Sequence, residues 1–229
     1  MSNRESSLKE KFRIALESTA KVISDDISSN KRNNDKNKSK DLNVENINSP
    51  SDFIRLRAET DSSALKKRFS DDSIYKKNLP SNNSSRSLYN IAEKIRYEAL
   101  GGQMMKGIEK NFHENYSQII NKKQKDQLKT KEDVSVTEAF ELYMLKNFHN
   151  VELNLLSSKM LSFWEKDFEK SIEKHKEFLL DNLEDQNIYA SRFYQIFEEM
   201  DIFQSEEDQT NEENQDQGQD NPSNDDQDK

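Results

Sequence analysis

Residues 87–116, SLYNIAEKIRYEALGGQMMKGIEKNFHENY, form the most regular stretch of this chain. Its apolar residues recur in steps of three and four, which places them on one face of a helix. They are Leu88, Ile91, Ile95, Ala99, Met105, Ile108, Phe112, Tyr116 and, just beyond, Ile119. Gly101, Gly102 and Gly107, three of the chain's four glycines, interrupt the pattern. A glycine inside a helix costs about 1 kcal/mol relative to alanine, so we expect a turn or a close approach here.

The composition limits how much of the 229-residue chain can fold around a core. Apolar residues make up 31% and charged residues 34%, against roughly 45–50% and about 25% in ordinary globular domains. From Gln204 onward ten acids and one lysine account for the whole net charge of −9. The absence of cysteine excludes disulfides and thiolate metal sites. No apolar run resembles a signal peptide or a membrane span, so we expect a cytoplasmic protein.

The remaining sequence predicts an all-α fold, an irregular bundle of roughly five to seven helices. We divide it into an N-terminal helix (1–27), a disordered Lys/Asn-rich connector (28–50), a helical domain (51–203) and a disordered acidic linker (204–229). Further helices are predicted over 51–77, 134–149 with Thr137 as N-cap, 156–183 as one long amphipathic helix, and 189–203. The first helix should bury one face, formed by Leu8, Phe12, Ala15, Thr19 and Val22 or Ile23.

No catalytic, cofactor-binding or metal-binding residue emerges from the motifs. His113-Glu114 begins like a zinc-protease helix, but Ser117 stands where the second histidine belongs. No phosphate-binding loop is present in the sequence, and a D-x-S-x-S metal-adhesion motif is not completed at any aspartate. His175 lies on an apolar face, where a packed histidine is more common than a ligand. Glu93 and Arg96, three residues apart, predict an ordinary surface ion pair.

The central stretch resembles the N-terminal region of CobT, a subunit of the aerobic cobaltochelatase. It follows the family pattern F-x-x-x-E-x-x-R-x-E-A-x-G-x-x-x-M-x-G-x-x-x-N through Tyr89, Glu93, Arg96, Glu98, Ala99, Gly101, Met105, Gly107 and Asn111. Three further elements resemble the family: Asp61-Ser62 with Ala64-Leu65, Trp164, and the L-x-D-Q segment with Asp185 and Gln186. We interpret these residues as structural or partner-docking.

The resemblance implies a non-catalytic module. In the family scheme an AAA+ ATPase, CobS, and a large subunit, CobN, insert cobalt(II) into a corrin ring, hydrogenobyrinic acid a,c-diamide, at the cost of ATP. Magnesium, ATP and cobalt would be handled by that complex, and this chain would hold no cofactor of its own. Because the family pattern includes Gly101 and Gly107 but not Gly102, we predict a helix break or C-cap at Gly101 and a close helix–helix contact at Gly107.

The sequence also departs from the family. The family usually has histidines near the positions of Ser70 and Tyr75. It also has a von Willebrand A-type domain after the acidic linker, whereas this sequence ends inside the linker, so we expect a fragment or the product of a split or truncated gene. The alternative function is an acid-tailed helical interaction or scaffold protein that has lost the chelatase role. Nucleic-acid binding through the lysine-rich segments 31–40 and 122–131 is disfavoured, because the body is charge-neutral and the tail would repel phosphates.

Overall fold

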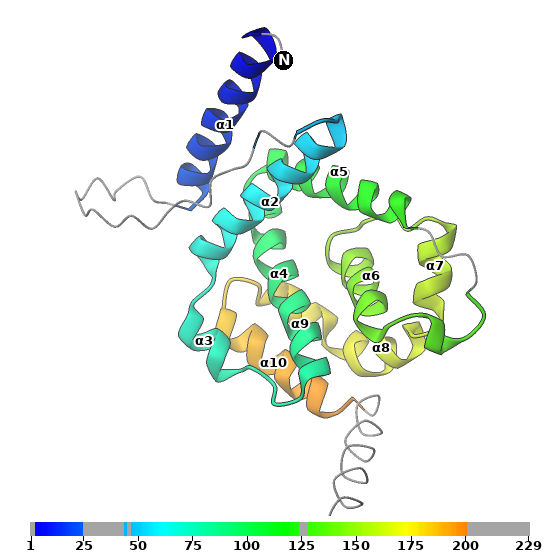
Figure 1. The fold of residues 1–229 in the computed structure, drawn as a ribbon. Helices are drawn as coiled ribbons and strands as arrows, with labels where there is room; N and C mark the ends of the chain where they lie inside the picture. Colours follow the sequence, from blue (N-terminus) through cyan, green and yellow to red (C-terminus); the bar gives the residue numbers. More distant parts are fainter. Residues whose placement is uncertain (1–2, 25–43, 45–46, 124–127, 201–229) are drawn as a thin grey trace, which may run out of the picture.

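The computed structural model describes residues 3–24, 44, 47–123 and 128–200, and within these ranges every regular element is a helix (Figure 1). The all-α prediction is therefore confirmed. The predicted acidic linker and most of the predicted connector lie outside the described residues. Among the described residues, no helix is long and apolar enough to cross a membrane.

The described helices follow one another along the chain. They are α1 (Asn3–Ile23), α2 (Pro50–Phe69), α3 (Asp72–Lys77), α4 (Asn83–Met104), α5 (Lys106–Lys122), α6 (Val136–Phe148), α7 (Leu155–Ser162), α8 (Glu165–Ile172), α9 (Lys176–Asp181) and α10 (Gln186–Glu198). Two 3-10 turns, Lys131–Asp133 and Glu173–His175, lie between them.

Helix α4 is the centre of the packing and contacts α2, α5, α6 and α10 (Figure 1). Its predicted apolar face is buried at Leu88, Ile95 and Ala99. Burial of apolar surface stabilises the fold by about 25 cal/mol per Å². The helix begins after Asn82, whose side chain accepts hydrogen bonds from the backbone N–H groups of residues 84 and 85. Helix α2 is also capped at its N-terminus, by a capping box of Ser49 and Asp52.

Two of the predicted helices are broken in the structure. Segment 51–77 divides at Ser70, which is extended, and Asp71 then caps α3. The predicted long helix over 156–183 becomes α7, α8, the turn Glu173–His175 and α9. Each piece buries its own apolar side chains, so packing overrides the continuous helical period. Helix α6 begins after Ser135, whose side chain caps it, and not after Thr137.

The predicted roles of the two family-pattern glycines are wrong. Gly101 lies inside α4, and a Cβ added there would lie 2.4 Å from Cδ1 of Leu65 on α2. The close helix–helix contact is therefore at Gly101. A Cβ added at Gly107 would meet nothing within 4 Å in the described structure outside its own helix. The helix break falls at Met105, in extended conformation with φ −142° and ψ 105°, which any residue can adopt.

Helix α1 packs on α2 and otherwise projects away from the body (Figure 1). It buries Leu16 and Ile23, whereas Leu8, Ala15, Thr19 and Val22 of the predicted buried face are exposed. The predicted face is thus rotated, because α2 covers only one side of α1. Val44 and Ile47, within the predicted disordered connector, are buried.

Candidate functional site

The family-pattern side chains gather in polar networks around α4, and Arg96 is the centre of the first. Its side chain is 0% exposed. Nε and Nη2 donate to the two carboxylate oxygens of Glu93 at 3.2 and 3.3 Å. The prediction of a surface ion pair is therefore wrong, because the i, i+3 spacing is the same on a buried face as on an exposed one.

The remaining donors of Arg96 tie α4 to two links that are distant in sequence. Nη1 donates to the carbonyl of Leu183 at 3.0 Å, just before α10. Nη2 donates to the carbonyl of Phe69 at 2.6 Å and to the hydroxyl of Ser70 at 3.4 Å, at the end of α2. A guanidinium presents five N–H donors in a fixed fork, so one side chain can hold all these acceptors.

Gln186, the first residue of α10, completes this network. Its Nε2 donates to Glu93 at 3.0 Å, and its Oε1 accepts from the backbone N–H of Asp71 at 2.7 Å. Burial raises the pKa of Glu93, and the charge of Arg96 opposes that rise. Tyr189, one turn along α10, donates its hydroxyl to the carbonyl of Ala92 at 3.1 Å. We call Arg96, Glu93 and Gln186 the arginine network.

A second network surrounds Glu98, which lies two residues after Arg96 and on the opposite side of α4. Ser62 on α2 donates to Oε1 of Glu98 at 2.6 Å, and the hydroxyl of Tyr116 on α5 donates to Oε2. Burial raises the pKa of Glu98 above its ordinary value. These bonds join α2, α4 and α5, and we call Glu98, Ser62, Tyr116 and the neighbouring His149 the Glu98 network.

His149 enters the Glu98 network from the end of α6. The helix ends there because Asn150 adopts a left-handed conformation, φ 52°, and the backbone N–H of Val151 returns to the carbonyl of Leu145. Nε2 of His149 lies 3.9 Å from Oε2 of Glu98 and has no hydrogen-bond partner among the described residues. Burial, with the nearby charges of His113 and Lys94, lowers its pKa to about 4.

Asp61 and Asn111 form a third polar contact between α2 and α5. Nδ2 of Asn111 donates to Oδ2 of Asp61 at 2.7 Å, and both side chains are buried. Burial raises the pKa of Asp61, whereas the hydrogen bond from Asn111 and the charge of Arg57 lower it. Asp61 and Asn111 are fifty residues apart in the sequence and meet where α2 contacts α5.

A comparison with protein families identifies the family of the chain. The model of the family described as cobalamin biosynthesis protein CobT matches residues 6–229. The chain belongs to the CobT family. Comparison with curated proteins and with solved structures gives no match. Membership assigns the chain to cobalamin biosynthesis and confirms the resemblance drawn from the sequence.

Tyr89, Ala99, Gly101, Met105 and Trp164 of the CobT pattern lie at packing positions, whereas Gly107 and Asp185 are exposed. Tyr89 is fully buried and donates its hydroxyl to the carbonyl of Tyr75 at 3.4 Å. Ala99 and Gly101 lie on the buried side of α4, and Met105 packs against the core where α4 ends. Trp164 donates its indole N–H to the carbonyl of Val134 at 3.0 Å, beneath the ammonium of Lys131.

The two departures from the CobT pattern lie beside the arginine network. Ser70 accepts a hydrogen bond from Arg96, and the backbone of Tyr75 accepts one from Tyr89. Sequence reasoning did not find this proximity, and it did not single out His149 or Tyr189. No local signal marks those two residues, because their importance comes from elements that meet only in the fold.

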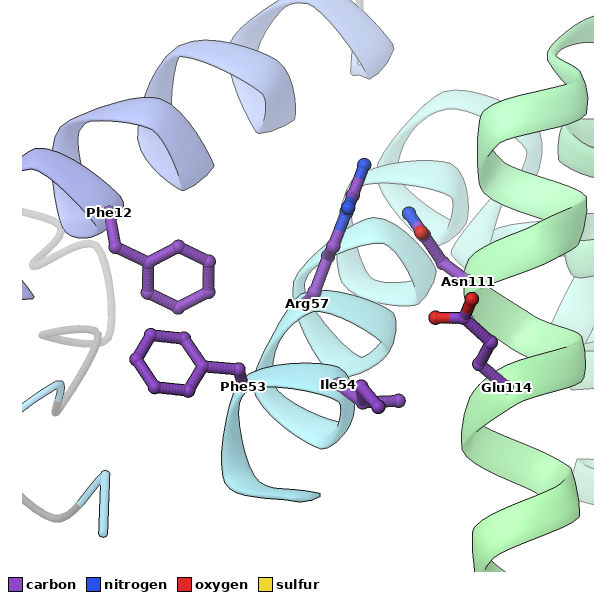
Figure 2. A pocket seen from close by; sticks show the side chains of 6 residues that line it. All are labelled: Phe12, Phe53, Ile54, Arg57, Asn111 and Glu114. Carbon is purple, nitrogen blue, oxygen red and sulfur yellow. The ribbon is translucent and has the colours of Figure 1, made fainter. Parts of the chain in front are cut away.

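Two surface grooves adjoin the networks. One, of about 650 Å³, opens over the arginine network between the end of α2 and the start of α10, and Arg68, Asp71 and Asp185 border it. Asp185 also caps α10. The other, of about 110 Å³, lies between α1, α2 and α5 (Figure 2). Phe12, Phe53, Ile54, Arg57, Asn111 and Glu114 line it.

The buried carboxylates of the networks are occupied by hydrogen bonds within the protein. The carboxylates of Glu93, Glu98 and Asp61 each accept hydrogen bonds from neighbouring side chains. In the described residues, no three His, Asp or Glu side chains lie close enough together to hold a metal ion. The arrangement can therefore hold four helices in one geometry and present the surfaces between them.

Proposed function

We propose that this chain is a non-catalytic docking module of an ATP-dependent cobaltochelatase. In this proposal it assembles with a CobS-like AAA+ ATPase and a CobN-like large subunit in the cytoplasm. The complex then inserts cobalt(II) into the corrin ring of hydrogenobyrinic acid a,c-diamide. ATP, magnesium and cobalt are handled by the partner subunits.

One observation carries the proposal: the polar residues of the CobT pattern are engaged in bonds between helices. Arg96, Glu93 and Gln186 join α2, α4 and α10, and Glu98 with Ser62 joins α2 to α4. A pattern that encodes a rigid arrangement of helices supports a role in which surface shape is recognised by other subunits.

Reconstitution of cobalt insertion tests this function. The purified ATPase and large subunit from the same organism are mixed with corrin substrate, Co²⁺ and ATP, with and without this chain, and the corrin absorbance is followed. We expect insertion only when the chain is present. An equal rate without the chain would favour the alternative, a helical interaction protein outside the chelatase.

A further inference from the structure

Helix α1 carries an apolar stripe that no described part of the chain covers. Leu8 is 61% exposed and Val22 is 55% exposed, and Ala15 between them is exposed as well. The three residues are seven apart, so they lie along one side of the helix over about 21 Å at 1.5 Å per residue. We call Leu8, Ala15 and Val22 the outer stripe.

The outer stripe runs beside the groove between α1, α2 and α5. Phe12 follows Leu8 by one turn and belongs both to α1 and to the groove. Its ring lies 4.8 Å from that of Phe53 on α2, edge to face, and Phe53 is itself 38% exposed (Figure 2). Apolar surface therefore extends from α1 across Phe53 and Ile54 toward α5.

Two basic residues beside this surface form no ion pair within the described part of the chain. Lys11, which lies between Leu8 and Ala15 on α1, and Arg57, one turn after Phe53 on α2, are exposed and form no ion pair with any described residue. The acid at the groove, Glu114, already pairs with Lys110 at 3.6 Å. An occupant with acidic side chains would complement Lys11 and also Arg57, whose charge acts in addition on the buried Asp61.

We propose that the outer stripe and the adjoining groove form the docking surface for an amphipathic helix of a chelatase partner subunit, with acidic residues flanking its apolar face. This inference rests on the proposed function and adds to it the surface and the chemistry of the partner. The length of the stripe fits a helix laid beside α1, and the groove of about 110 Å³ accepts one apolar anchor side chain.

A second copy of this chain fits the surface less well. An antiparallel pair of outer stripes centred on Ala15 would bring Lys11 opposite Ser18 and Thr19, so a second α1 offers no acid to Lys11. The charge pattern thus favours a different protein with an acidic flank.

The test measures binding of the full chain to the purified CobS-like ATPase and, separately, to the CobN-like subunit by biolayer interferometry. Leu8→Glu and Arg57→Glu change exposed residues on the proposed surface. Each should weaken binding to one of the two subunits by about tenfold or more, and rising salt should weaken wild-type binding.

Matched controls lie on the same helices. Ile14→Glu changes an exposed apolar residue of α1 roughly 120° around the helix from Leu8, and Lys67→Glu reverses an exposed charge of α2 ten residues beyond Arg57. Both should bind as wild type does. Circular dichroism melts of all four variants check that their helix content and thermal stability match those of the wild type.

The outcomes are distinct. If the wild type binds and the Leu8→Glu/Arg57→Glu double variant binds equally well, the surface is wrong and the proposed function stands. If the wild type binds neither subunit, both the proposed function and the proposed docking surface are refuted. If light scattering shows a dimer of this chain that Leu8→Glu dissociates, the surface is a self-association site and the proposal is overturned.

Discussion

Arg96 shows what a single residue contributes to this fold. Its guanidinium is fully buried and bonds to Glu93, Phe69, Ser70 and Leu183. Taking such a charge from water is costly, and only a near-complete set of acceptors offsets that cost. An arrangement of α2, α4 and α10 that left the buried guanidinium without these acceptors would therefore be unfavourable.

Arg96→Met should lower the free energy of unfolding by about 3–5 kcal/mol, because the buried Glu93 would lose the cation that hydrogen-bonds to both of its oxygens. Urea denaturation measures the change. The control is Arg55→Met, which removes an exposed i, i+4 ion pair with Glu59 and should cost less than about 1 kcal/mol. Equal losses in the two variants would contradict the central place of Arg96.

The glycines give a second prediction at this scale. Gly101→Ala should destabilise the chain by about 1–3 kcal/mol, because the added Cβ meets the fully buried Leu65 side chain. Gly107→Ala, in open space within α5, should be neutral or stabilise by up to about 1 kcal/mol. Thermal melts of the two variants decide it, and a more harmful change at Gly107 would refute the assignment.

His149 predicts a pH dependence of stability. Its folded pKa of about 4 lies below the ordinary 6.5, so its contribution is complete above pH 6.5 and is lost as the pH falls toward 4. At about 1.4 kcal/mol per pH unit, the loss reaches about 3 kcal/mol. Urea denaturation from pH 7 to 4 should show this loss in the wild type and a flatter profile in His149→Gln.

Glu98 provides the opposite sign in the same network. Its folded pKa is raised by burial, so its contribution is complete below the ordinary value of 4.5 and is lost as the pH rises through the folded pKa. The wild type should therefore lose stability as the pH rises above 4.5, and Glu98→Gln should remove this loss. Unchanged pH profiles for both variants would show that neither group titrates with folding.

At the scale of elements, the sequence predicted where helices exist better than where they end. The central pair and the helix over 134–149 were found because their apolar steps are long and regular. The predicted helix over 156–183 is wrong because Trp164 turns its indole toward the carbonyl of Val134, and α8 starts afresh beyond it. No glycine or proline marks that break, so only the packing partner determines it.

Trp164→Phe tests this element. The smaller ring can keep its packing against Phe168, but the hydrogen bond to Val134 is lost, and we expect a cost of about 1–2 kcal/mol. Tyr194→Phe, a change at an exposed position of α10, should cost less than about 0.5 kcal/mol. Guanidinium denaturation of both variants gives the comparison.

At the scale of the molecule, the all-α class follows from composition and periodicity, but the networks do not. Asp61 and Asn111, or Glu93 and Gln186, are separated by many residues and meet only once the helices are packed. Within the CobT pattern, Glu93 bonds to Arg96 and Gln186, and Asn111 bonds to Asp61. The exposed stripe on α1 was predicted as buried, because periodicity reports an apolar face but not what covers it.

The central claim is that this rigid module docks a chelatase partner. Size-exclusion chromatography with light scattering, on the full chain mixed with the CobS-like ATPase and with the CobN-like subunit in the presence of ATP, tests it most directly. The account predicts a stoichiometric complex with at least one of the two subunits at micromolar concentrations. Elution of the chain alone in both mixtures would contradict it.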